Sequence, residues 1–219
     1  MNRRTSLVPR TSLSNNDVYS VLLKHYSVQI GDKEVSEQVK TKLMMVAQWL
    51  LSDGEKRSLL LLGGVGNGKT SMVWAVYNSL KFLRDFAFKG RTKEEEDALK
   101  PLIKIPIPSV YKAIKIVNKA SEDPTTVKNL KDEGFIAIDD IGVEPTEIMN
   151  FGSRFQPIVD IIYGRYDNRK PTIYTTNLDW SDMQVKYGPR VVDRLKEECL
   201  VIAYTEASFR TGVQYERKK

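Results

Sequence analysis

The chain has 219 residues, 41% of them hydrophobic, which is ample for the packed core of one α/β domain of ordinary size. Its single cysteine, Cys199, excludes an internal disulfide or a cysteine-rich zinc site, and the lack of an apolar run of ~18 residues or of a signal-peptide pattern predicts a soluble, cytoplasmic protein without membrane contacts. The net charge of +6 is compatible with a nucleic-acid partner but does not establish one, because acidic residues are also plentiful.

The N-terminal part is predicted to be a basic arm followed by two helices. Residues 1–14 carry arginine, serine and threonine and are typical of a mobile arm. Apolar residues at helical spacing predict a short helix over Asp17–Tyr26 and a longer one over Glu34–Leu51. We therefore divide the chain into residues 1–34, a candidate partner-binding segment, and residues 35–219, the main domain.

A glycine-rich loop follows the second helix. A strand over Ser58–Leu62 runs into residues 63–70, Gly-Gly-Val-Gly-Asn-Gly-Lys-Thr, and a helix continues to about Phe86. This spacing indicates a loop whose backbone N–H groups wrap a phosphate chain, with Lys69 reaching the β/γ-phosphates and Thr70 binding Mg²⁺. The alternative, a glycine-rich turn with a surface lysine, is disfavoured by the flanking strand and helix. The residues predicted to contact the nucleotide are Gly63, Gly64, Val65, Gly66, Asn67, Gly68, Lys69, Thr70 and Ser71.

The next segment mixes charged and apolar stretches. Residues 89–100 are predicted to form a surface loop or a frayed helix, Leu102–Ile105 a second strand, and Ser109 the cap of a following helix. Basic residues of that helix are candidates to line a channel for single-stranded DNA, with an aromatic ring for stacking, although a solvated helix face is an equally open reading. These residues are Lys112, Lys115, Lys119 and Tyr111.

An apolar run over Phe135–Ile138 ends in two acids, Asp139 and Asp140. A buried strand of this kind places carboxylates at the carboxyl edge of a sheet, beside a phosphate loop. Asp139 would then hold Mg²⁺, and Asp140 would orient an attacking water as general base. The alternative is a pair of acids that caps a strand-to-turn transition before Gly142.

The remaining elements continue the alternation of strand and helix. Helices are predicted over 125–133, 155–168, Ser181–Tyr187 and Arg190–Glu197, and strands over Thr172–Thr175 and Leu200–Tyr204. Such alternation requires crossover connections. We therefore predict a five-stranded, mainly parallel sheet with helices on both faces.

Polar residues late in the chain could complete a phosphate site. Asn177 follows a strand and is positioned to bridge a nucleophilic water and a γ-phosphate, or it is an ordinary turn residue. Arg190 and Arg194 share a helix face, and Arg210 follows the last strand. A guanidinium is well suited to stabilise charge on a transferring phosphoryl group.

The order of these motifs resembles that of a known family. GGVGNGKT, FIAIDDIG, TIYTTN, KYGPRVVDRL and TEASFRTGV resemble segments of AAA+ ATPases of the bacterial helicase-loader type (DnaC-like), which are related to IstB-like transposition helpers. The resemblance covers roughly residues 35–213. It implies an α/β P-loop NTPase of AAA+ type that binds and hydrolyses ATP with Mg²⁺, self-associates with ATP at the interface, and delivers a replicative helicase to single-stranded DNA.

The resemblance also assigns roles to individual residues. Asp139 and Asp140 match the acidic pair, and Asn177 matches the first sensor. Arg194 matches an arginine finger that acts on a neighbouring subunit, and Arg210 matches the second sensor.

The sequence departs from the helicase-loader family in two ways, and several alternative functions stay open. From the short segment before residue 35 we expect any helicase-gripping domain to be reduced to an arm and one short helix, and from the short stretch after Arg210 we expect no separate helical lid. An IstB-like helper of a transposase would share the ATP chemistry but bind duplex DNA. A small-molecule kinase would need a mobile lid that carries arginines, and no such segment follows Asn177. Many ATPases have glutamate at the position of Asp140, so an adaptor that binds ATP without hydrolysing it is a further alternative.

Overall fold

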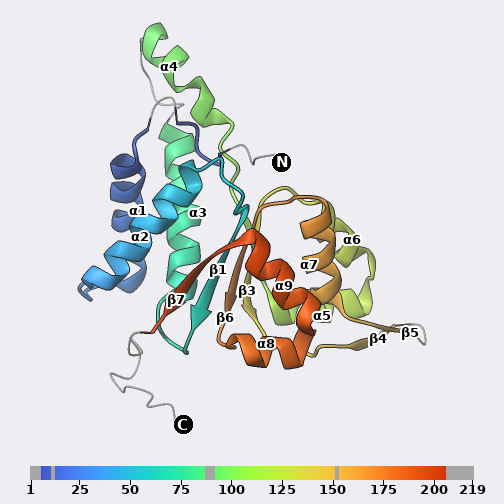
Figure 1. Cartoon of the computed structure of the whole chain (residues 1–219). Coiled ribbons are helices and arrows are strands. Elements are labelled where there is room, and N and C mark those ends of the chain that lie inside the picture. The colour runs from blue at the N-terminus through green and yellow to red at the C-terminus, as the bar shows by residue number, and fades with distance from the viewer. Residues whose placement is uncertain (1–5, 11–12, 87–91, 151–152, 206–219) are drawn as a thin grey trace. The chain divides into compact units, whose positions relative to one another are not determined.

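The computed structural model describes residues 6–10, 13–86, 92–150 and 153–205. The chain forms two compact units (Figure 1). The first comprises Met1–Glu55 and Thr70–Pro108, and the second comprises Lys56–Lys69 and Ser109–Lys219.

The first unit is built from helices. They are α1 (Asn15–Ile30), α2 (Glu37–Leu51), α3 (Lys69–Phe86), which enters this unit at Thr70, and α4 (Lys93–Ile103). The first two confirm the helices expected from apolar spacing, and side-chain caps at Ser14 and Ser36 explain where they begin. No helix within the described ranges is long and apolar enough to cross a membrane.

The strand predicted over Leu102–Ile105 is wrong, because this segment ends a helix. Thr92 forms a capping box with Glu95 and starts α4 where a loop or frayed helix was expected. Leu102 and Ile105 are buried while Ile103 is exposed, which is the three-residue spacing of a helical turn and not the alternation of a strand.

The second unit contains one parallel sheet. Its strands are β1 (Ser58–Gly63), β2 (Ser109–Lys112), β3 (Ile136–Ile141), β6 (Thr172–Thr176) and β7 (Cys199–Tyr204), in the order β2-β3-β6-β1-β7. All four neighbouring pairs are parallel, so the predicted α/β fold with a five-stranded sheet is confirmed. Because β1 lies between β6 and β7, the segments that follow these strands meet at one edge.

Helices and a hairpin complete the second unit. The helices are α5 (Ala113–Glu122), α6 (Thr125–Asp132), α7 (Pro157–Asp167), α8 (Trp180–Tyr187) and α9 (Pro189–Glu198). Their apolar faces form one buried core with the central strands, which fixes the sheet in place.

The antiparallel hairpin of β4 (Ile148–Asn150) and β5 (Ser153–Phe155) was not expected from the sequence. In Figure 1 it extends to the right of α8, below α6 and α7.

The sheet gains its edge strand from residues that the sequence suggested were helical. Ser109 does not cap a helix but starts β2, which pairs with β3 in a register that sets Lys112 beside Asp139. Val110 and Tyr111 are good strand formers, and Pro108 favours extended backbone before them. The helix begins only at Ala113.

The amino ends of β3 and β6 are held together by Arg165 of α7, whose side chain is fully buried. Its Nε donates to the Thr172 hydroxyl at 2.6 Å. The other donors reach backbone carbonyl oxygens at 2.6–2.8 Å, those of Leu130, Glu133, Gly134 and Pro171. Every acceptor is uncharged. We call Arg165 and these five hydrogen bonds the amino-end clamp, because they join α6 and α7 to the amino ends of β3 and β6.

Candidate active site

The phosphate loop lies between β1 and α3 and is packed against the end of β7. A Cβ atom on Gly63 would lie 2.2 Å from the carbonyl oxygen of Tyr204, so only glycine fits there. Gly66 and Gly68 have φ angles of 82° and 87°, a region that glycine adopts without strain. The loop is therefore shaped by contacts that the motif alone did not reveal.

Lys69 folds back over the loop. Its ammonium donates to the carbonyl oxygens of Gly63 at 2.7 Å and Gly64 at 2.6 Å. Burial lowers the pKa of this group to about 8, although attraction to Asp140 and Asp139 opposes the shift. The positive charge of Lys69 and the negative charges of the acidic pair therefore attract each other across the sheet edge.

The other predicted nucleotide contacts surround this lysine in the sequence. Asn67 is buried, and its side-chain amide donates to the Tyr204 carbonyl at 3.4 Å. Val65 is exposed, and Thr70 and Ser71 stand in the first turn of α3.

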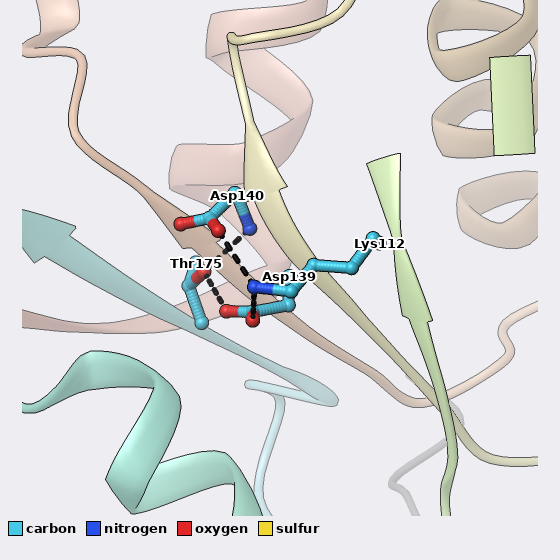
Figure 2. Close-up of polar contacts among 4 residues, drawn as sticks. All are labelled: Lys112, Asp139, Asp140 and Thr175. Carbon is cyan, nitrogen blue, oxygen red and sulfur yellow. Dashed lines mark hydrogen bonds and ion pairs between the residues drawn. The ribbon is translucent and has the colours of Figure 1, made fainter. Parts of the chain in front are cut away.

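The acidic pair stands at the carboxyl end of β3 in a cluster of four residues (Figure 2). The Thr175 hydroxyl donates to Asp139 Oδ1 at 2.6 Å and accepts from the Asp140 N–H at 2.8 Å. The Lys112 ammonium donates to Asp139 Oδ2 at 2.5 Å and to Asp140 Oδ2 at 2.7 Å. Three adjacent strands, β2, β3 and β6, thus supply one charged cluster.

The backbone at Asp140 departs from regular strand geometry. Its φ angle is 60°, in the left-handed region that aspartate tolerates better than most residues. The pairing of β3 with β6 shifts register between Ile138 and Ile141, as in a bulge. The irregularity lies within the acidic pair, where backbone strain is often associated with function.

The loop that follows the acidic pair is fastened to α8. The buried carboxylate of Glu144 accepts from the Gly142 N–H at 2.8 Å and from the Tyr187 hydroxyl. Lys186 donates to the Glu144 carbonyl at 2.6 Å. These contacts fix the loop after β3 on the helix that follows β6.

The structure separates the predicted sensor and finger residues. Asn177 follows β6 directly, two positions after Thr175. Arg194 instead lies over the rings of Tyr163 and Tyr166 of α7, 4.3 Å and 5.1 Å from their centroids. Arg190 is exposed on α9, and Arg210 lies outside the described residues.

Two residues of the cluster were missed or misassigned. Lys112 was predicted to stand on a helix and face DNA, but it ends a strand and bridges the acidic pair. Its correct place required the register of β2 on β3. Thr175 was not predicted, although a hydroxyl residue near the end of the strand before Asn177 was a usable signal.

The oxygen atoms of the cluster fit a magnesium ion. Asp139 and Asp140 already hold one cation, the Lys112 ammonium, with both carboxylates. Mg²⁺ is typically bound through one or two carboxylates together with phosphate oxygens and water. Asp139 is the stronger candidate ligand, because its carboxylate is buried and oriented by Thr175.

Comparisons with known proteins support the fold. No known protein family and no curated protein matches the chain. Among solved structures, the DnaC helicase loader matches with a TM-score of 0.56 and 16% identity, over 83% of this chain and 98% of that one. DnaI matches with a TM-score of 0.53 and 16% identity, over 86% and 92%.

AMPPCP-bound DnaA from Aquifex aeolicus matches with a TM-score of 0.51 and 17% identity, over 84% of this chain and 52% of that one. The chain therefore shares the fold of these structures, which agrees with the α/β fold class that its motifs predicted, and its structural neighbours include helicase loaders.

Proposed function

We propose that this protein is a Mg²⁺-dependent ATPase of the helicase-loader type, which delivers a replicative helicase to single-stranded DNA during replication. The observation that carries the proposal is the position of the acidic pair, which lies at the same carboxyl edge of the sheet as the phosphate loop, since β3 and β1 are both parallel neighbours of β6. Asp139 and Asp140 supply the carboxylates, and Lys69 supplies the phosphate-binding charge. A bound magnesium ion would neutralise phosphate charge in the transition state.

The chain's own residues would divide the chemistry as follows. Residues 63–71 bind the triphosphate, and Thr70 and Asp139 are the proposed metal ligands. Asp140 orients and deprotonates the attacking water, and Asn177, the residue after β6, holds the same water. Arg210 is assigned to the nucleotide of its own subunit.

Arg194 is proposed to act on the nucleotide of a neighbouring subunit. It lies on α9 against two tyrosine rings of α7 and forms no ion pair with the acidic pair of its own chain among the described residues. Such a finger requires self-association with ATP at the interface, so an isolated subunit would hydrolyse ATP slowly.

The DNA-binding surface is proposed from the remaining basic residues of α5. Lys115 and Lys119 are exposed and stay available for a phosphate backbone, whereas Lys112 is engaged by the acidic pair. Binding of single-stranded DNA should weaken steeply with salt. We also propose a cytoplasmic location, because a bacterial helicase loader would act where the DNA is replicated.

The test measures binding of a fluorescent ATP analogue and release of phosphate, with and without single-stranded DNA. Lys69→Ala should abolish analogue binding, while Arg194→Ala should bind the analogue normally and lose hydrolysis. Lys128→Ala, which removes an exposed charge on α6, is the control and should match the wild type. Full hydrolysis by Arg194→Ala would remove the interface model, and hydrolysis without an acceptor would argue against a kinase.

A transposition helper of the IstB type is the second candidate, because it would use the same ATP site. A pull-down with ATP distinguishes the two by the partner that it captures, a hexameric helicase or a transposase. Preference for duplex over single-stranded DNA would favour the helper.

A further inference from the structure

We propose that Lys112 is an internal counter-ion of the acidic pair, which competes with Mg²⁺ and so sets the metal concentration at which the site is loaded. The proposal rests on the nucleotide site described above and goes beyond it, because it concerns which cation the carboxylates hold. It follows from three features of the cluster: shared oxygen atoms, unequal mobility, and local charge.

The ammonium occupies the oxygen atom that a metal ion would need. Asp139 Oδ1 accepts from Thr175, and Asp139 Oδ2 accepts from Lys112 at 2.5 Å. The same ammonium lies 2.7 Å from Asp140 Oδ2. A metal ion that binds Oδ2 of either carboxylate would meet the ammonium at contact distance, and two cations cannot share that position.

The lysine is the partner that can leave. The Asp139 side chain is 1% exposed and fixed by Thr175, whereas the Lys112 side chain is 43% exposed. Lys112 also ends β2, the edge strand of the sheet, which pairs only with β3 among the described strands. A long, half-exposed side chain can move into solvent without breaking the core.

The charges around the cluster make this exchange unfavourable until nucleotide arrives. Two adjacent carboxylates need a cation, and Lys112 supplies it in direct contact, with Lys69 as a second nearby positive charge. A bound triphosphate would engage Lys69 and add negative charge at the edge, which favours a divalent ion over a single ammonium. The lysine therefore disfavours metal binding without nucleotide.

The test titrates Mn²⁺ alone, followed by electron paramagnetic resonance, into the wild type and a set of variants. Lys112→Met should lower the dissociation constant for Mn²⁺ about tenfold or more, because the competing charge is gone. Lys112→Arg keeps the charge and should stay within about threefold of the wild type, since a guanidinium also pairs with carboxylates. Lys128→Met, an exposed lysine on α6, is the matched control and should not change the constant.

Thermal unfolding gives a second readout that does not require turnover. Without metal, Lys112→Met should unfold at a lower temperature than the wild type, because the two carboxylates repel each other. Added Mg²⁺ should raise the unfolding temperature of Lys112→Met more than that of the wild type. Lys112→Gln should behave in the same way, which separates the loss of charge from the loss of a polar group.

Some outcomes would overturn the proposal. Equal Mn²⁺ constants in Lys112→Met and the wild type would show that the lysine does not compete, and a weaker constant in the variant would show that it assists. Failure of the wild type to bind the fluorescent ATP analogue would instead refute the proposed function, because Mn²⁺ titration without nucleotide measures the carboxylates separately.

Discussion

At the amino ends of β3 and β6 one buried guanidinium, Arg165, donates five hydrogen bonds to uncharged acceptors, whereas at the carboxyl ends of the same strands two carboxylates share one lysine. The Arg165 side chain is fully buried, whereas the second arrangement opens to solvent through the Lys112 side chain. Arg165 and the two carboxylates all have hydrogen-bond partners, but only the carboxylates are paired with a cation, Lys112, that another cation could replace.

This difference separates stability from function along one pair of strands. The acceptors of Arg165 are four backbone carbonyls and one hydroxyl, none of which carries a charge that would attract another cation. Carboxylates at a sheet edge accept any cation that fits, so their occupancy depends on what is bound. Substitutions at the amino end should therefore act mainly on the free energy of unfolding, and those at the carboxyl edge mainly on metal binding and hydrolysis, with smaller effects on stability.

The largest effect is expected at Arg165. Arg165→Met should lower the free energy of unfolding by about 3–5 kcal/mol, since buried carbonyl groups lose their donors. Chemical denaturation measures this loss. Arg154→Met, which removes an exposed arginine of β5, is the control and should change stability by less than about 0.5 kcal/mol. A loss below 1 kcal/mol for Arg165→Met would contradict the claim that the amino ends of β3 and β6 mainly serve stability.

The acidic edge should show the opposite behaviour. If Asp140 is the general base, Asp140→Asn should slow ATP hydrolysis about 100-fold, equivalent to about 2.7 kcal/mol of barrier. Stability should change by less than about 1 kcal/mol, because the side chain is partly exposed. Single-turnover phosphate release measures the rate. A variant that unfolds would show that the edge is structural as well, and one that hydrolyses ATP normally would support a different base.

A buried acid at the amino end of β7 gives a pH-dependent test. Burial raises the pKa of Glu198 from 4.5 to about 7, and Arg57 opposes this only in part. The folded state therefore keeps a proton that the unfolded state releases, so the contribution of Glu198 to stability is greatest below pH 4.5 and is lost as the pH rises through about 7. Glu198→Gln should remove this slope and should be more stable than the wild type at pH 8 by about 2 kcal/mol.

Denaturation curves at several pH values compare the two proteins directly. Parallel pH profiles for the wild type and Glu198→Gln would show that Glu198 is ionised in the folded protein, and the amino end would then carry an exchangeable charge as well.

The smallest effect is expected at Thr175, which orients the acidic pair from β6. Thr175→Val keeps the shape but removes the hydroxyl bonds to Asp139 and Asp140, which should cost about 1 kcal/mol of stability. If the hydroxyl fixes the metal ligand, Mn²⁺ binding should weaken as well. Unchanged binding with reduced stability would make Thr175 a purely structural residue.

The sequence was informative where chemistry and local structure coincide. The phosphate loop and the acidic strand each lie within one short segment, so β1, β3 and the position of Asp139 followed from apolar runs and from what ended them. The cluster itself did not follow. The contact of Lys112 with Asp139 depends on the register of β2 against β3, and a four-residue strand has too few residues to show alternation.

The hairpin and the amino-end clamp were missed for a related reason. The strands β4 and β5 have three residues each, below the length at which a pattern can be recognised. Arg165 resembled any helix arginine in the sequence, because its acceptors are backbone groups brought together by folding. The division at residue 35 and the roles of Asn177, Arg194 and Arg210 stay predictions.

The attachment of Glu144 to α8 has a mechanical consequence. The chain runs from Asp140 to Glu144 in four residues, and Glu144 is gripped by Lys186 and Tyr187 near the end of α8. Gly188 alone joins α8 to α9, and both helices pack into the same core. A shift of α8 should therefore move α9 as well. If Arg194 acts on a neighbouring subunit, as proposed above, a displacement of the strand end when its cation is exchanged would shift Arg194 and so signal the state of one subunit's site to the next.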